Sequence, residues 1–337
     1  MDCPGENLLI KLWESIADKG IGSLLKPWQM RREGRATVDT RRAELLALAQ
    51  AEVDAAAIRA GEKKLLPDGT LSNVSANIQE FLLMPSSQPL LLSHIDKIAE
   101  NDSRAEAIRR EISIAKAVIY AEEELAQDSQ EPSETQVSED WLLRWRDYAA
   151  SVSSDELQSL WGKVLAGEIK TPGKFSLRTL EFLRNLSQDE ASGIELLSSF
   201  VINNEFIFRE NAILESNGVT FSLLLIMQDL GIVCGVESIG MEMTWSSPLQ
   251  DKFEFALLSY GRLLLVRHTD AKIQLKLPIY KITSLGQQIL KLGVFQANDR
   301  YLRALGETIK SQGFDIGIGS CVQISNAQIT FSDLQPL

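Results

Sequence analysis

The chain has 337 residues, of which 45% are hydrophobic and 24% charged, close to the averages of globular proteins. This length exceeds the usual size of one domain, so we expect at least two domains. The formal net charge is −12 at pH 7, because 46 acidic residues outnumber 34 basic ones. Such an acidic surface excludes general attraction to nucleic acid or anionic lipid, and either ligand would require a local basic patch.

The cysteines and the N-terminus predict a soluble, cytoplasmic protein. Three widely spaced cysteines make neither a disulfide framework nor a cysteine-based zinc site: Cys3, Cys234 and Cys321. A signal peptide would begin with positive charge, whereas Asp2 and Glu6 are acidic. The most apolar run, residues 221–233, is shorter than the roughly 20 residues with which a helix crosses a bilayer.

The N-terminal part of the chain is predicted to be mainly helical. Apolar residues recur at helical spacing in residues 8–17, and residues 37–61 are rich in Ala, Leu, Glu and Arg. Further helices are expected over residues 75–84 and 89–126. Eight acidic residues and no basic one lie from residue 122 to residue 140, a composition that is typical of a solvated connector.

Start and stop signals for short helices are dense between residues 138 and 191. The expected N-caps are Ser138, either Ser153 or Ser154, Ser176 and Ser187, and Glu190 lies where it would complete a capping box with Ser187. A proline followed by a glycine at residues 172–173 predicts a turn between two of the helices. We expect four short helices in this segment.

The remainder of the chain mixes strands with helices. Residues 220–233 predict a helix followed by a strand, and residues 262–282 predict two strands that form a hairpin. A helix from Ser284, a helix closed by Gly313 and a last pair of short strands over residues 321–331 are expected to follow.

These elements predict an α+β fold, with mainly helical N-terminal and central regions and a winged-helix-like α+β domain at the C-terminal end. We expect four parts: basic amphipathic N-terminal helices (1–66), a helical region ending in the acidic connector (67–137), a compact helical core (138–200) and the winged-helix-like domain (201–337). No internal repeat of fixed period is visible in the sequence.

Residues that could carry catalysis are scarce. His94 and His268 are too few for a multi-histidine metal centre, and neither a Walker A sequence nor a G-x-S-x-G motif occurs. The glycines of residues 313–319 do not match a dinucleotide-binding loop and predict a turn before a strand. The sequence therefore predicts no catalytic residues, no metal and no cofactor.

One set of residues remains a candidate for metal-dependent nuclease chemistry. Asp68 follows a proline, and Glu168 and Lys170 have the spacing of the acidic and basic residues in such enzymes. These residues are far apart in the chain and fall on a predicted turn and a predicted helix end rather than on adjacent strands. We therefore favour a structural role for them.

The strongest local charge pattern is basic. Seven basic residues and two acidic ones occur from residue 19 to residue 42, with Trp13 and Trp28 nearby. This segment is a candidate for docking onto an anionic partner, either nucleic acid or a membrane surface. The alternatives are a solvated helix face or a contact with the chain's own acidic connector. The candidate docking residues are Lys26, Arg31, Arg32, Arg35, Arg41 and Arg42.

Three tryptophans belong to the segment of short helices. Trp141 and Trp145 are four residues apart and share one helix face, and Trp161 follows in the next predicted helix. Aromatic residues at helical spacing usually fill a core, so we expect all three to be buried. A ligand cage is the alternative.

The same segment resembles a bacterial family known as domain of unknown function 2806. The similar features are a Trp, a Leu-Ala-Gly-Glu step, a Pro-Gly turn, a Ser-x-Arg-Thr-Leu helix start and an Asn-Leu-Ser cap. In this sequence they are Trp161, 165–168, 172–173, 176–180 and 185–187. Residues 20–36 are more loosely similar to an N-terminal segment of that family and of abortive-infection-like bacterial proteins, with Leu-Lys-Pro where many relatives have Tyr-Glu-Pro.

The family brings no accepted enzyme activity, and its motif is explicable by architecture. Glycine lets two helices approach or ends one, Pro-Gly reverses the chain, and an arginine is expected to pair with a nearby acidic residue. The motif residues, which we interpret as mainly structural, are Trp161, Gly167, Glu168, Pro172, Gly173, Ser176 and Arg178.

We expect a non-enzymatic recognition or assembly component of a bacterial system, with anti-phage defence implied by the abortive-infection-like resemblance. The expected partners are further copies of the chain, bound through the apolar face of helix 37–61, and a protein encoded by a neighbouring gene. One alternative is a nucleic-acid-binding effector, with or without nuclease activity, that uses the basic segment and the 272–281 hairpin. Another is attachment of the N-terminal helices to a membrane surface.

Overall fold

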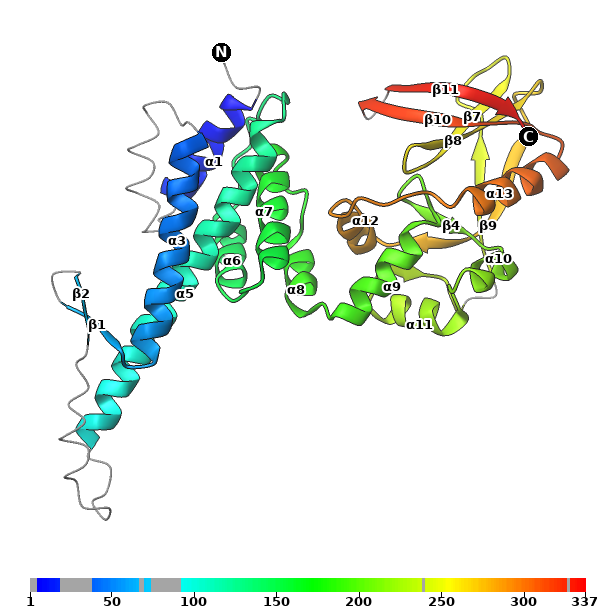
Figure 1. The fold of residues 1–337 in the computed structure, drawn as a ribbon. Coiled ribbons are helices and arrows are strands. Elements are labelled where there is room, and N and C mark those ends of the chain that lie inside the picture. Colours follow the sequence, from blue (N-terminus) through cyan, green and yellow to red (C-terminus); the bar gives the residue numbers. More distant parts are fainter. Residues whose placement is uncertain (1–4, 19–37, 67–69, 74–91, 238–239, 326–327) are drawn as a thin grey trace. The chain divides into compact units, whose positions relative to one another are not determined.

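The computed structural model describes residues 5–18, 38–66, 70–73, 92–237, 240–325 and 328–337 (Figure 1). The described residues form eleven helices and eleven strands, and their strands pair antiparallel. The predicted α+β fold is confirmed. The chain divides into two compact units, residues 1–180 and 181–337. No helix among the described residues is both long enough and apolar enough to cross a membrane.

The first unit is built around one long helix, α5, of 35 residues. The helices α1, α3, α6 and α7 pack against it. The elements of this unit are α1 (Glu6–Asp18), α3 (Val38–Arg59), β1 (Lys63–Leu65), β2 (Leu71–Asn73), α5 (Leu92–Ala126), α6 (Glu139–Ala149), α7 (Asp155–Lys170) and α8 (Leu177–Asn185), which runs into the second unit. The predicted helices over 8–17, 37–61 and 89–126 are present, and the one over 75–84 lies outside the described residues.

Small residues bring α5 and α7 close together. A Cβ atom added at Gly162 of α7 would lie 2.5 Å from the Cβ of Tyr120 and 2.8 Å from the carbonyl oxygen of Ala117. Ala117 and Ala121 of α5 are completely buried. Because no side chain separates the two backbones at this point, the core of the unit depends on glycine and alanine here.

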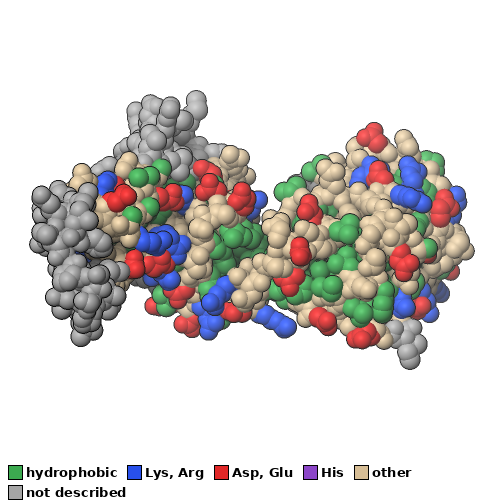
Figure 2. All heavy atoms as spheres, turned by 60° about the horizontal axis from the view of Figure 1, so that its bottom comes forward, with side chains coloured by type: hydrophobic (Ala, Val, Ile, Leu, Met, Phe, Trp, Pro, Cys, Tyr) green, Lys and Arg blue, Asp and Glu red, His purple; other side chains and the backbone are tan. Residues whose placement is uncertain are grey.

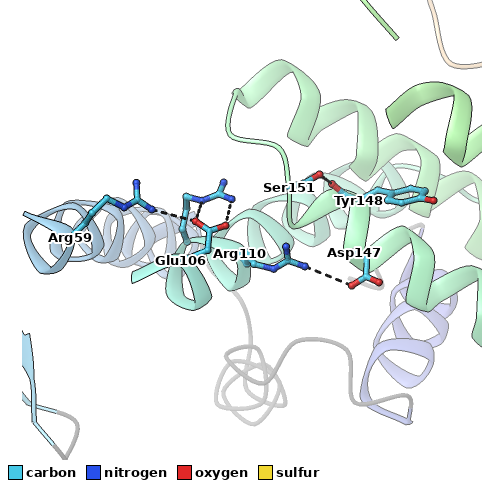
Figure 3. A network of polar contacts seen from close by, with 7 residues as sticks. Arg59, Glu106, Arg110, Asp147, Tyr148 and Ser151 are labelled. Carbon is cyan, nitrogen blue, oxygen red and sulfur yellow. Dashed lines mark hydrogen bonds and ion pairs between the residues drawn. The ribbon is translucent and has the colours of Figure 1, made fainter. Parts of the chain in front are cut away.

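The helix α3 packs along α5 through its apolar face, with Leu48, Ala55 and Ile58 buried. Self-association of the protein through this helix remains a prediction, and within the chain α5 already covers part of the same face. Polar contacts flank the packing (Figure 3). Glu106 of α5 lies between Arg59 of α3 and Arg109 of α5, and a weaker ion pair joins Arg110 of α5 to Asp147 of α6 at 3.8 Å.

The acidic connector lies against α1 and α7. The ammonium group of Lys11 donates hydrogen bonds to the carbonyl oxygens of Ser133 and Thr135, at 2.6 and 2.9 Å. Asp128 accepts from Lys170 at 2.7 Å, and Val137 is only 5% exposed. Composition predicted a solvated segment, and most of residues 127–138 are exposed, while two lysines that are distant in sequence hold the segment to the first unit.

The second unit contains two antiparallel sheets. One has the strand order β11-β10-β8-β7, and the other has the order β3-β4-β9-β5, with β6 also paired to β9. The strands are β3 (Val201–Ile202), β4 (Phe206–Phe208), β5 (Val233–Cys234), β6 (Met241–Ser246), β7 (Phe253–Ser259), β8 (Arg262–His268), β9 (Gln274–Ile282), β10 (Asp315–Ser325) and β11 (Gln328–Pro336).

Five helices accompany these sheets. They are α9 (Gln188–Ser198), α10 (Asn211–Ser216), α11 (Phe221–Asp229), α12 (Ser284–Leu290) and α13 (Asp299–Ser311). The expected capping box at Ser187 and Glu190 begins α9, and Thr220 caps α11. Tyr301 of α13 is completely buried, and its hydroxyl accepts a hydrogen bond from the backbone N–H of Phe208 at 2.6 Å. This contact ties α13 to β4.

Two sequence-based interpretations in this unit are wrong. The strands β8 and β9 were expected to form a hairpin, but β8 pairs with β7 and β10, while β9 pairs with β4, β5 and β6 in the other sheet. The glycines of residues 317 and 319 lie inside β10 and do not form a turn before it. A Cβ at Gly319 would lie 2.8 Å from the carbonyl oxygen of Ser332, so the partner strand approaches too closely for a side chain.

Candidate functional site

The three tryptophans form a core in the first unit, as the sequence predicts. Trp141, Trp145 and Trp161 are 4%, 0% and 1% exposed. The indole N–H of Trp145 donates to the carbonyl oxygen of Trp161 at 2.9 Å, and that of Trp141 donates to the carbonyl oxygen of Phe175 at 2.7 Å. The indole N–H groups of Trp141 and Trp145 thus each have a backbone partner, which explains how these two rings are buried without an unpaired donor.

The motif residues around Glu168 build a single turn. Glu168 lies in the last turn of α7 and is 2% exposed. One carboxylate oxygen accepts from the backbone N–H of Gly173 at 2.6 Å, and the other accepts from that of Phe175 at 3.0 Å. Gly173 has a φ of +86°, a conformation that glycine adopts without strain. The carboxylate therefore organises the Pro-Gly turn that follows its own helix.

Gly167 completes this turn by leaving room for an aromatic ring. A Cβ at Gly167 would lie 2.6 Å from the Phe175 ring, which is itself buried. The next helix begins with Ser176, whose hydroxyl oxygen accepts from the backbone N–H of Thr179 at 3.2 Å. Pro172 precedes the glycine at the tip of the turn. Gly167, Glu168, Gly173 and Ser176 thus all have contacts within this turn and the start of the next helix.

Burial raises the pKa of Glu168 above the ordinary range of a glutamate. Hydrogen bonds from the backbone N–H groups of Gly173 and Phe175 act in the opposite direction, because they stabilise the charged form, but desolvation is the larger effect. Arg178 is exposed. The sequence predicts that Arg178 pairs with Glu168 or with an acidic residue of an adjacent helix, whereas the Glu168 carboxylate is held by the backbone of its own turn.

The candidate nuclease residues are used separately. Lys170 donates to Asp128 at 2.7 Å, while the Glu168 carboxylate faces the turn at residues 173–175. Asp68 lies outside the described residues. Among the described residues, no group of three or more His, Cys, Asp and Glu side chains is placed to hold a metal ion.

The predicted anionic-partner docking set falls outside the described side chains. Lys26, Arg31, Arg32 and Arg35 lie in residues 19–37, and Arg41 and Arg42 lie on the first turns of α3, where the backbone alone is described. His94 is in the same situation at the start of α5. His268 ends β8, where its ring accepts from the backbone N–H of Asp270 at 3.0 Å and lies edge-on to Phe314, a structural arrangement.

A surface that the sequence did not single out lies on α11. Phe221 and Ile226 are 51% and 50% exposed, whereas Leu224 and Met227 of the same helix are buried. Leu196 of the adjacent helix α9 is 37% exposed. We call this the α9–α11 face: Leu196, Phe221, Leu225, Ile226 and Asp229. Hydrophobic side chains are visible among acidic ones on the side of the second unit that comes forward in Figure 2.

Sequence reasoning missed this face because an apolar run suggests a buried helix. The distribution of charged residues along the sequence nevertheless marked this region as acidic. From residue 185 to residue 251 the chain has ten acidic residues and a single basic one, Arg209. The Arg209 guanidinium lies over the ring of Tyr280 at 5.5 Å from its centroid.

These features define an α+β protein of two units. In the first unit, the buried acidic residue of the motif, Glu168, stabilises a turn. The second unit presents the α9–α11 face, which combines exposed apolar and acidic side chains. Residues 99–306 match the family model described as "Protein of unknown function (DUF2806)", which spans most of the chain. The chain belongs to this family, as the resemblance of its central segment indicates. No curated protein and no solved structure matches it.

Proposed function

We propose that this protein is a non-enzymatic recognition or assembly component that acts by binding another protein. The observation that carries the proposal is the α9–α11 face, where Phe221 and Ile226 are half exposed beside a well-packed core. Exposed apolar side chains that gather on one face and are rimmed by charge are typical of protein interfaces. The structural use of Glu168 and Lys170 supports a role other than catalysis.

The order of elements in the second unit supports a winged-helix-like arrangement. Helix α9, strand β4, helices α10 and α11, and strands β5 and β9 follow one another along the chain, and β9 lies between β4 and β5 in the sheet. In DNA-binding helix-turn-helix domains the second helix of the pair enters the major groove. Helix α11 has that place in the order but carries no Lys or Arg, which favours a protein ligand over nucleic acid.

A second candidate function uses a different part of the chain. The charge pattern of residues 26–42 favours a nucleic-acid-binding effector, with or without nuclease activity, or attachment to an anionic membrane surface. Either activity would act through the basic segment and would leave the α9–α11 face unexplained.

The proposed setting is the bacterial cytoplasm, within an anti-phage defence system. In this setting the protein works as a homo-oligomer or together with a protein encoded by a neighbouring gene. The similarity of residues 20–36 to abortive-infection-like bacterial proteins supports the setting.

The test compares binding partners of the purified full chain. Light scattering gives its oligomeric state, and co-expression with the products of neighbouring genes shows whether a stable complex forms. Parallel assays measure binding to DNA, RNA and anionic liposomes at low and high salt. A complex with protein alone supports the proposal. Salt-dependent binding to nucleic acid or lipid without any protein complex would overturn it, as would Mg²⁺-dependent cleavage of DNA or RNA that disappears in Glu168→Gln with the fold unchanged.

A further inference from the structure

We propose that the α9–α11 face binds a basic, amphipathic segment of a partner protein; this inference rests on the proposed function and specifies its partner. The face combines exposed apolar side chains with negative charge. The exposed residues of α11 lie on one side of the helix, because Phe221, Ser222, Ile226 and Asp229 fall within an arc of about 140° at 100° per residue. The half-buried Leu225 lies in the same arc. An arc of this width accommodates one partner helix or extended segment.

The neighbouring helix enlarges the face. Gly193 of α9 would place a Cβ 2.8 Å from Met227 and 3.0 Å from Leu223, so α9 and α11 are in close contact. Leu196, one turn further along α9, lies near Gly218, which precedes α11. Leu196 therefore lies beside the segment that leads into α11, and it is a third exposed apolar side chain in addition to Phe221 and Ile226.

The charges around these apolar groups have one sign. Glu195 of α9 and Asp229 of α11 are exposed, and neither has an ion-pair partner among the described residues. Glu237 lies beside the same end of α11, where it accepts from the side chain of Gln228 at 2.9 Å. Neither α9 nor α11 carries a Lys or Arg, so these two helices favour a partner that carries Lys and Arg over an acidic one, including nucleic acid.

The position of Asp229 on α11 is unfavourable for the stability of the helix. It is the last residue of α11, where the carbonyl end of the helix is already partly negative. An acidic side chain is unfavourable there, and a basic side chain would stabilise the helix. A basic group on the partner would interact favourably with both the Asp229 carboxylate and the negative carbonyl end of α11. Asp229 would then contribute to binding although it does not stabilise the folded helix.

The experiment uses three fluorescein-labelled peptides of equal length with helical periodicity: one of Lys and Leu, one of Glu and Leu with the same apolar face, and one of Lys and Ser. Fluorescence anisotropy measures their binding to the full chain. We expect the Lys/Leu peptide to bind at least about tenfold more tightly than either of the others, since binding needs both the charge and the apolar groups.

Matched variants locate the binding. Phe221→Ser with Ile226→Ser, and separately Glu195→Lys with Asp229→Lys, should each weaken Lys/Leu binding by about tenfold or more. Glu124→Lys with Glu134→Lys changes the net charge equally on exposed positions of the first unit and should leave the affinity within about threefold. Circular dichroism verifies that each variant is folded. The Asp229→Lys exchange should in addition raise the melting temperature.

Several results would overturn the inference: no binding of the Lys/Leu peptide, equal binding of the Glu/Leu peptide, or an equal loss in the Glu124 and Glu134 control. Binding of a DNA duplex that is lost in the Phe221 and Ile226 variant would overturn it in favour of nucleic acid. If a co-expressed partner protein still binds that variant, the proposed function stands and its location on α9–α11 is wrong.

Discussion

The carboxylate of Glu168 accepts a hydrogen bond from the backbone N–H of Gly173, five residues later, at 2.6 Å. A buried acid thus holds the turn that follows its own helix, instead of facing solvent or a ligand. The second oxygen accepts from Phe175, whose ring occupies the space left by Gly167. The residues of the family motif contact one another, so the substitution of one of them should disturb the conformation of the whole turn.

The exchange Glu168→Gln should destabilise the protein by about 1–3 kcal/mol, because Gln offers one acceptor oxygen to the backbone N–H groups of Gly173 and Phe175 and leaves one buried donor without its partner. The loss should also depend on pH. Since the folded-state pKa of Glu168 is raised, folding favours the protonated form, and the group stabilises the protein most below the ordinary pKa of a glutamate. This contribution is lost as the pH rises through the folded-state pKa.

Urea unfolding at a series of acidic to neutral pH values measures this effect. The difference in unfolding free energy between wild type and Glu168→Gln should be larger at acidic pH than at neutral pH, since the other carboxyl groups cancel in the difference. A difference that grows toward neutral pH would show that the charged form is the one stabilised by folding.

Replacing Trp161 by Ala should cost roughly 3–5 kcal/mol of unfolding free energy, because the ring is 1% exposed and a cavity would remain. Leu157→Ala is the control on the same helix, since that side chain is 42% exposed and should cost less than about 1 kcal/mol. Denaturant unfolding distinguishes the two. Equal costs would mean that the tryptophan core does not stabilise the unit.

In the second unit, Tyr301→Phe should cost about 1–3 kcal/mol, because the N–H of Phe208 loses its partner in a fully buried place. Tyr280→Phe is a gentler comparison: Tyr280 is buried as well, but its hydroxyl donates at 3.0 Å to the side chain of Asn211, an exposed residue. Thermal unfolding should therefore show a larger shift for Tyr301. Similar shifts in both variants would contradict the special role assigned to the bond between α13 and β4.

The basic segment permits a test that separates binding from folding. Changing Arg31, Arg32, Arg35, Arg41 and Arg42 to Ser should abolish salt-dependent binding to nucleic acid or anionic liposomes, the second candidate function, because the segment is predicted to dock onto an anionic partner. The melting temperature should stay nearly constant, since exposed charges contribute little to stability. A variant that unfolds would instead assign these arginines to the structure of the first unit.

Local signals in the sequence were sufficient for most helices. The capping box at Ser187 and the glycine stops, such as Gly231 and Gly313 with positive φ, operate over a few residues and are visible without a fold. Pairing between strands is different. The partners of β8 and β9 lie up to 75 residues away, as for Phe206 and Lys281, and hydrophobic alternation alone does not choose between a neighbour in sequence and a distant strand.

Some features of the candidate site could likewise be predicted from local sequence, and others depend on tertiary packing. Burial of Trp145 and Trp161 could be predicted from composition and spacing, because aromatic pairs on one helix face seek a core. The exposure of Phe221 and Ile226 could not, since α11 is apolar around much of its circumference and only the packing of α9 and the sheet decides which side is covered. The hydrogen bonds of Glu168 could not be predicted without the conformation of the turn, because their donors are backbone N–H groups of later residues.

Strand β9 is bonded along both of its edges, to β4 on one side and to β5 and β6 on the other. Residues 247–252, which connect β6 to β7, are largely exposed. Strand β6 lies before this connection in the chain and its partner β9 lies after it. A chain cut within 247–252 should therefore leave two fragments that stay associated, because each contributes strands to the same sheet. The backbone amides of β9 should exchange with deuterated solvent later than those of the strands at the sheet margins, since exposing them requires several strands to separate together.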